Sequence, residues 1–211
     1  MIDKTVSDIN NKEMEILLAA EQEFLEKGYS GARTVSIAER AGVTHAMLHY
    51  YFRSKELLFE RVLDSKIELL ANSVIVSLDS GNGEKTVLER VEDFVRRHYQ
   101  FVSENSKLPL FVINEIVGDE QRMELLKAKI GSKILGMVGL YQAQLDQAVK
   151  NGEICAINIL TLVTDIAAMN LFSVMAKPVF EHILKMGDEG YDKWRCEENV
   201  TVITKRLMIC E

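Results

Sequence analysis

The chain has 211 residues, of which 47% are hydrophobic, so it is long enough to bury a large core. Its formal net charge of −7 excludes a protein that coats nucleic acid over its whole surface. Only two prolines interrupt long stretches in which apolar residues recur at helical spacing, and this pattern predicts an all-α fold.

The first predicted elements are one long helix followed by two short ones. Apolar residues recur every four positions over 10–27, and Gly28 stands where a left-handed helix end favours glycine. Short helices are expected over about 35–41, with Thr34 as the N-cap, and over about 45–51, with Thr44 as the N-cap. Ser54 is expected to cap a long helix that reaches about residue 77.

The remaining helices follow the clearest break in the sequence, "DSGNGE" at 79–84. We expect them over about 84–104, 108–118, 121–150, 155–177 and 192–209. Pro109 falls in a first helical turn, where proline is tolerated, and Asn151-Gly152 ends another helix. The apolar stretch 157–176 contains one charge, Asp165, and we expect it to be a helix covered by protein rather than a membrane span.

The cysteines and the N-terminus indicate the cellular setting. The three cysteines have no metal-ligand spacing, and their odd number argues against a disulfide framework. The first fifteen residues lack the apolar run of a signal peptide. We therefore expect a cytoplasmic protein with no cofactor and no metal site.

The stretch "TVSIAERAGVTHAMLHYYF" has the form of a helix-turn-helix. Gly42 can adopt the positive φ that a sharp turn needs, and Ala38 is small enough for the second helix to cross closely. Ile37, Val43, Leu48 and Phe52 are expected to hold the two helices together. The segment 27–55 carries a net charge of +4 and leaves −11 on the other residues, which indicates a small face that meets an anion.

Residues 14–63 closely resemble the DNA-binding domain of TetR-family transcriptional regulators. The resemblance is carried by "FLEKGY" at 24–29, Thr34, "IA" at 37–38, "AGV" at 41–43, "L.YYF" at 48–52 and "SKEL" at 54–57. It implies a helix-turn-helix DNA-binding domain over 1–55 and a helical effector-binding and dimerisation domain over 56–211. It also implies a homodimer, usually a repressor, on double-stranded operator DNA.

The resemblance and the motif together give the candidate DNA contacts. Hydroxyls, helix N-termini and lysine bind phosphates, while the outward residues of the second helix meet base edges. Phosphate contacts are expected from Thr34, Tyr50 and Lys55, and base or groove contacts from Thr44, His45, Ala46, Met47 and His49.

The resemblance also suggests that the last two helices form a four-helix dimer bundle with a second subunit. Two apolar stripes are the candidate interface, with burial inside one chain as the alternative: Ile159, Leu162, Val163, Ile166, Met169, Val200, Ile203 and Leu207.

A small, largely apolar effector of unknown identity is expected among the helices from 84 to 176, because ligand sites are usually apolar cavities with a few polar groups. The candidates are Phe94, His98, Phe101, Phe111, Glu115, Met137, Tyr141, Asn170 and Met175. Two alternatives remain open: a DNA-binding protein that acts through protein partners, and a helical enzyme. The enzyme has little support because the sequence lacks hydrolase, zincin and phosphate-loop motifs.

Overall fold

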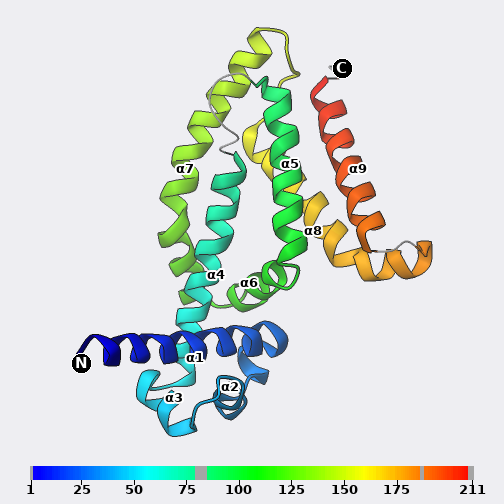
Figure 1. Cartoon of the computed structure of the whole chain (residues 1–211). Coiled ribbons are helices and arrows are strands. Elements are labelled where there is room, and N and C mark those ends of the chain that lie inside the picture. Colours follow the sequence, from blue (N-terminus) through cyan, green and yellow to red (C-terminus); the bar gives the residue numbers. More distant parts are fainter. Residues whose placement is uncertain (1, 79–84, 186–187, 209–211) are drawn as a thin grey trace. The chain divides into compact units, whose positions relative to one another are not determined.

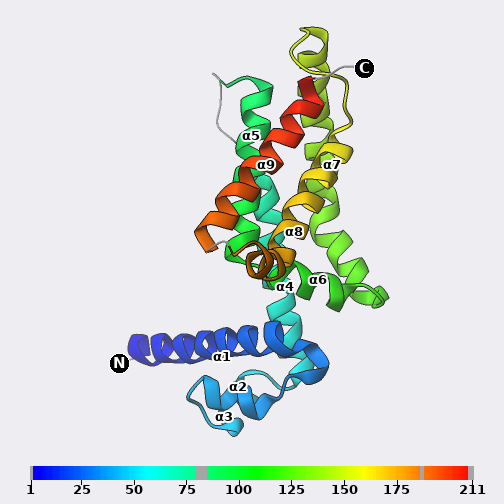
Figure 2. The same cartoon turned by 90° about the vertical axis from the view of Figure 1, so that its right-hand side faces the viewer.

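We analysed a computed structural model that describes residues 2–78, 85–185 and 188–208. Every regular element among these residues is an α-helix, labelled α1 to α9 in Figures 1 and 2. The all-α prediction is therefore confirmed. The predicted break at 79–84 lies outside the described residues.

The chain divides into two compact units. The N-terminal unit comprises Met1–Leu69 and Leu110–Met123, and the C-terminal unit comprises Leu70–Pro109 and Glu124–Glu211. The expected boundary at residue 55 therefore does not coincide with the structural division. Phe59 shows why, since its ring is fully buried in the N-terminal unit between Phe24 and Phe111, at centroid distances of 4.9 and 5.9 Å.

The first three helices of the N-terminal unit agree with the sequence pattern. They are α1 (Ile2–Gly31), α2 (Thr34–Arg40) and α3 (His45–Tyr51). Helix α1 begins earlier than predicted and is kinked at Gly28, whose φ of 66° is the left-handed conformation expected there.

The helix caps confirm two of the three predictions. The Thr44 hydroxyl accepts a hydrogen bond from the Met47 N–H at 3.2 Å, and the Ser54 hydroxyl accepts one from Leu57 N–H at 3.2 Å. Ser54 thus precedes α4 (Lys55–Leu78) as predicted. The prediction for Thr34 is wrong, because Arg33 is the N-cap and Thr34 is the first helical residue.

The C-terminal unit is built on α5 (Val87–Glu104), α8 (Ile159–Leu184) and α9 (Asp188–Met208), which pack against one another (Figure 1). Helix α6 (Leu108–Ile116) precedes α7 (Glu120–Lys150), most of which belongs to this unit. Helix α8 starts later than predicted because Asn158 caps it, accepting a hydrogen bond from Leu160 N–H at 2.8 Å. It also continues past Pro178.

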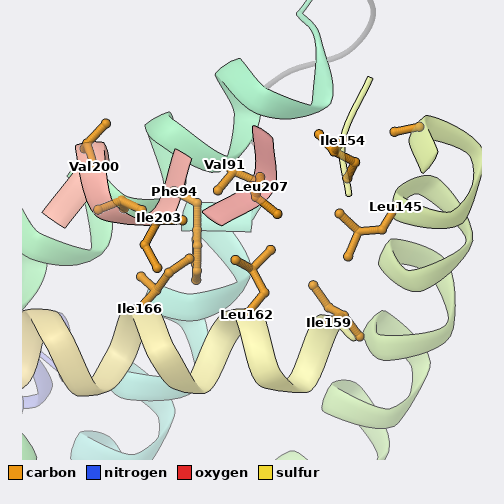
Figure 3. Close-up of a cluster of buried hydrophobic side chains, with 12 residues drawn as sticks. Val91, Phe94, Leu145, Ile154, Ile159, Leu162, Ile166, Val200, Ile203 and Leu207 are labelled. Atoms are coloured by element: carbon orange, nitrogen blue, oxygen red, sulfur yellow. The ribbon is translucent and has the colours of Figure 1, made fainter. Parts of the chain in front are cut away.

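The core of the C-terminal unit lies where α5, α8 and α9 meet, with contributions from α7 (Figure 3). Phe94 of α5 points toward Leu162 and Ile166 of α8, and Ile203 of α9 closes the cluster. By length and composition alone, α8 would also suffice to cross a membrane. Its Ile159, Leu162 and Ile166 are buried in this core, but Phe172, Val179 and Ile183 are exposed, so the chain itself covers the helix on one side only.

Two of the cysteines lie in the described part of the chain. Cys155, whose N–H donates to the Leu207 carbonyl at 2.7 Å, is disulfide-bonded, which the odd cysteine count did not lead us to expect. Cys196 is a half-buried free thiol, and burial raises its pKa.

Candidate nucleic-acid interface and internal cavity

The turn between α2 and α3 is fixed by backbone hydrogen bonds. The Val43 N–H donates to the Ala38 carbonyl at 3.0 Å, and the Gly42 N–H donates to the Glu39 carbonyl at 3.1 Å. Gly42 has a φ of 64°, which a residue with a side chain adopts only under strain. Ile37, Leu48 and Phe52 are buried beneath the turn, so the angle between α2 and α3 is held by packing as well.

One face of α3 is left open to solvent. Six of the eight side chains that the sequence assigned to the DNA are exposed, including Met47 at 38% and Tyr50 at 76%, whereas Thr34 and Lys55 are half-buried. The other exposed members are Thr44, His45, Ala46 and His49. The structure therefore gathers these six candidates on one short element. Their contact with DNA stays a prediction.

Thr34 joins the start of α2 to the start of α3. Its hydroxyl lies 3.0 Å from His45 Nε2, and the His45 ring lies 5.2 Å from the His49 ring. When Nε2 carries the imidazole proton, it donates to the Thr34 oxygen and leaves the hydroxyl proton free for a phosphate. The tautomer of His45 therefore decides whether Thr34 is a phosphate donor.

The basic residues near α3 differ in how far they are neutralised. Lys27 and Arg40 form ion pairs with Glu23 at 2.7 and 3.3 Å, and Arg40 also pairs with Glu26 at 3.0 Å. These pairs neutralise two of the five basic residues that give the segment its charge of +4.

Three basic residues are left on this side of the unit. Within the described part of the chain, Arg33, Arg53 and Lys55 have no ion pair with a carboxylate. Arg33 and Arg53 are exposed, and neither was among the candidates named from the sequence. The sequence could have indicated Arg33 and Arg53 as candidates, because both are basic and flank the helix-turn-helix.

Lys55 is held over an aromatic ring. Its Nζ lies 4.6 Å from the centroid of Tyr29, and the Arg122 guanidinium lies 5.4 Å from the same centroid. The Tyr29 N–H donates to Glu115 Oε1 at 2.9 Å, and Arg122 Nη1 donates to Glu115 Oε2 at 3.1 Å. A cation–π contact of this kind restricts the Lys55 side chain while leaving its charge intact.

The C-terminal unit encloses a small cavity of about 50 Å³ between α5, α7 and α8. Its wall is mainly apolar, and its polar lining groups are Arg90, Tyr141 and Gln144. Arg90 Nη1 donates to Gln144 Oε1 at 3.0 Å, which ties α5 to α7 at the wall. The complete lining is Val87, Arg90, Val91, Phe94, Tyr141, Gln144, Leu145, Ile159, Leu162 and Val163.

The candidates named for an effector are distributed over several places. Phe94 and Tyr141 line the cavity. Phe101 packs in a second cluster with Tyr99, Met137 is half-buried, and Met175 is 51% exposed.

Two of these candidates belong to the N-terminal unit instead. Phe111 packs on Phe59, and Glu115 binds Tyr29 and Arg122, so the structure does not bring them to this cavity. Sequence reasoning missed Arg90 and Gln144 as lining residues.

His98 and Asn170 form a buried polar network beside the cavity. Asn170 Nδ2 donates to the Val95 carbonyl at 3.0 Å and lies 3.1 Å from His98 Nδ1. Asn199 Nδ2 donates to Asn170 Oδ1 at 2.8 Å, so one chain of hydrogen bonds joins α5, α8 and α9. Burial lowers the pKa of His98 from its usual 6.5 to about 4, so the ring is neutral at pH 7.

The structure corrects the prediction that these two apolar stripes form the dimer interface. Six of their residues are at most 5% exposed within a single chain and belong to its own core, so they present no surface to a second subunit. Val163 and Met169 are only partly buried and pack against the same core. The six are Ile159, Leu162, Ile166, Val200, Ile203 and Leu207.

A different face of α8 is apolar and exposed. Phe172, Val179 and Ile183 are 66%, 58% and 64% exposed and recur at helical spacing along one side. Exposed Met175 belongs to the same stripe. An apolar stripe of this size on the surface indicates an interaction site.

Comparison with known proteins agrees with the geometry of the first unit. A family model described as bacterial regulatory proteins of the tetR family matches residues 16–62. The regulator RutR of Escherichia coli is 41% identical over 61 residues, which are 29% of each chain. The fatty acid metabolism regulator protein of Bacillus subtilis is 24% identical over 144 residues, which are 68% of this chain and 71% of that protein.

Several curated relatives are matched over a limited part of their length. The regulator YdgC of Bacillus subtilis is 31% identical over 96 residues, which are 44% of this chain and 48% of that protein. The activator FasR of Mycolicibacterium smegmatis is matched over 41% of its length. The chain therefore spans less than half the length of these two relatives.

Solved structures resemble the chain over most of its length. The fatty acid degradation regulator FadR of Bacillus halodurans superposes with a TM-score of 0.58 at 18% identity, covering 92% of this chain and 94% of that one. AibR in complex with isovaleryl coenzyme A and operator DNA superposes with a TM-score of 0.63 at 16% identity, covering 90% and 97%. At such low identity these likenesses establish the fold.

Proposed function

We propose that this chain, which belongs to the TetR family of bacterial regulatory proteins, is a ligand-responsive repressor of transcription. It binds a near-palindromic operator as a homodimer and leaves it when a small, largely apolar effector binds. The DNA-binding part of this proposal rests on the exposed face of α3. Arg33, Arg53 and Lys55 lie near it and form no ion pair among the described residues.

On DNA, α3 enters the major groove. Its N-terminal side chains His45 and Met47 meet base edges, and Lys55 and Tyr50 meet phosphates on either side. Two copies of α3 then read two half-sites about 34–36 Å apart, which is one turn of the double helix. Binding weakens steeply with salt because each phosphate contact releases counterions.

The homodimer uses the exposed apolar stripe of α8. Phe172, Val179 and Ile183 bury their side chains against the same stripe of a second copy, since an interface with two-fold symmetry pairs one patch with itself. The two stripes that the sequence suggested for the interface are instead buried in the core of each chain.

The effector enters the cavity between α5, α7 and α8. It drives release only if it binds the two conformations of the dimer with different affinity. Helix α4 runs from Lys55, at the proposed DNA surface, into the C-terminal unit at Leu70, so a swing of α4 changes the separation of the two recognition helices. That AibR is described in complex with both isovaleryl coenzyme A and operator DNA supports an effector of acyl type.

The replacement Lys55→Ala tests the DNA-binding half. We expect weaker binding to every duplex and a salt slope, log K against log salt, that is smaller by about 0.9. Arg61→Ala is the matched control, because Arg61 is a cation of the same unit that pairs with Glu13 at 3.8 Å. Fluorescence anisotropy at several salt concentrations measures both. An unchanged affinity of Lys55→Ala at physiological salt contradicts the proposed placement of α4.

A further inference from the structure

Arg90 differs from several other arginines of the C-terminal unit in its partners. Arg96 pairs with Glu197 and Arg206 pairs with Asp165. Arg90 is half-buried and donates a hydrogen bond to the neutral Gln144, with no carboxylate of the described residues within ion-pairing distance. Gln144 takes only one of the five N–H donors of a guanidinium.

Arg90 also stands at the junction of two spaces. Val87, Arg90 and Gln144 line the inner cavity, and the same three residues line an open cleft of about 430 Å³ next to it. The cleft is the more polar of the two, and its further lining residues are Lys85, Thr86, Gln147, Ala148, Asn151 and Glu153. A molecule that occupies both spaces therefore passes Arg90.

Among the cations that line the cleft, Arg90 is the one without a neighbouring carboxylate of the described residues, since Lys85 is paired with Asp93. Glu153 also lines the cleft and carries a negative charge, so an anion is favoured on the Arg90 side. A partly desolvated guanidinium without a carboxylate partner binds a carboxylate or phosphate oxygen strongly, often with two parallel hydrogen bonds.

The size of the inner cavity limits the apolar part of the ligand. A water molecule needs about 10–15 Å³ of such space, so 50 Å³ holds roughly four non-hydrogen atoms. The wall around them includes Phe94, Leu162 and Val163. This space suits a short hydrocarbon group and excludes a long chain.

We propose that the effector is a short-chain acyl compound whose hydrocarbon tail fills the inner cavity and whose anionic group binds Arg90 at the mouth. This assignment rests on the proposed effector role of the cavity and names the chemistry that the cavity selects. The anion is the carboxylate of a free short-chain acid, because only a group attached directly to the tail reaches an arginine that lines the same cavity.

Isothermal titration of the full-length protein, without DNA, tests this assignment. The probes are butyrate, its neutral amide butyramide and butyryl coenzyme A. We expect butyrate to bind, and butyramide to bind more weakly by at least about tenfold. Butyryl coenzyme A has no carboxylate beside its tail, so we expect it to bind more weakly than butyrate.

Two replacements test the assignment to Arg90 and to the inner cavity. Arg90→Gln is expected to weaken the binding of the anionic probe by about tenfold to a hundredfold, because it removes a charge-assisted hydrogen bond. Val163→Phe is expected to abolish binding by filling the cavity. Arg97→Gln, on the exposed side of the same helix, is the matched control and should leave the affinity unchanged.

Several outcomes overturn the proposal. They are an Arg90→Gln variant that binds the anion as tightly as the unmodified protein, butyramide that binds as tightly as butyrate, butyryl coenzyme A that binds more tightly than butyrate, and no binding of any probe. The comparison of butyrate with butyramide uses the unmodified protein, so it still tests the need for an anion if Arg90→Gln does not fold. Because DNA is absent, failure of the DNA-binding proposal leaves this result readable.

Discussion

His98 makes the stability of this protein depend on pH in a direction that the structure fixes. The ring is 7% exposed and accepts from Asn170 Nδ2, which requires an unprotonated Nδ1. Burial lowers its pKa from 6.5 to about 4. Between these values the unfolded chain binds a proton that the folded chain does not, so the free energy of unfolding falls as the pH is lowered.

The size of the effect follows from the same two values. Across the window from pH 6.5 to pH 4, each pH unit costs about 1.4 kcal/mol for one group. Lowering the pH from 7 to 5 therefore removes about 2 kcal/mol through His98. The loss begins near pH 6.5 and is complete below pH 4, where both states are protonated.

Urea denaturation at pH 7 and pH 5 measures this contribution. In His98→Asn the amide oxygen keeps an acceptor for Asn170 and the side chain does not titrate, so about 2 kcal/mol of the pH dependence should disappear. His182→Asn is the matched control, because His182 is exposed on α8 and its replacement should leave the pH dependence unchanged. A His98→Asn variant with the full pH dependence of the unmodified protein refutes the reasoning.

Three further replacements test other parts of the account. Glu23→Ala removes a fully buried carboxylate that pairs with Lys27 and Arg40, and should cost about 1–3 kcal/mol in urea denaturation, because the remaining cations are partly exposed; an unchanged stability would show that these pairs contribute little. Gly28→Ala should cost about 1–2 kcal/mol, because φ is 66° and the added Cβ would lie 3.0 Å from Glu115 Oε1; an unchanged thermal midpoint would contradict this. Phe172→Glu should convert the dimer to a monomer in light scattering after size exclusion, and a persistent dimer would exclude the α8 stripe as the interface.

The helix-turn-helix could be predicted from the sequence because local chemistry determines it. Gly42 supplies the positive φ, Thr44 and Ser54 cap the following helices, and Leu48 and Phe52 alternate with exposed positions. Each of these signals acts within a few residues, so a single sequence contains it.

The exposed apolar face of α8 could not be predicted because α8 is apolar on more than one side. Ile166 and Phe172 are equally hydrophobic, yet one is fully buried in the chain and the other is 66% exposed. Helical spacing shows that a stripe exists, and only the packing of α5 and α9 decides which stripe the chain itself covers.

The lining of the cavity was missed for a related reason. Arg90 was not among the candidates named from the sequence, although it lies three residues after Val87 and four before Phe94, on the face of α5 that lines the cavity. A charged residue on an apolar helix face was the available signal. Its partner Gln144 comes from α7, 54 positions further along the chain, and nothing local indicates that contact.

Selection of bound sequences from a random duplex library, with the purified full-length protein at moderate salt, tests the central claim most directly. The account predicts enrichment of an inverted repeat whose half-sites are separated by about one helical turn, with preferences that shift when Met47 is replaced. The folded protein is tested before and after dialysis to remove any bound effector. If it enriches no sequence in either state, the account of a sequence-specific regulator is contradicted.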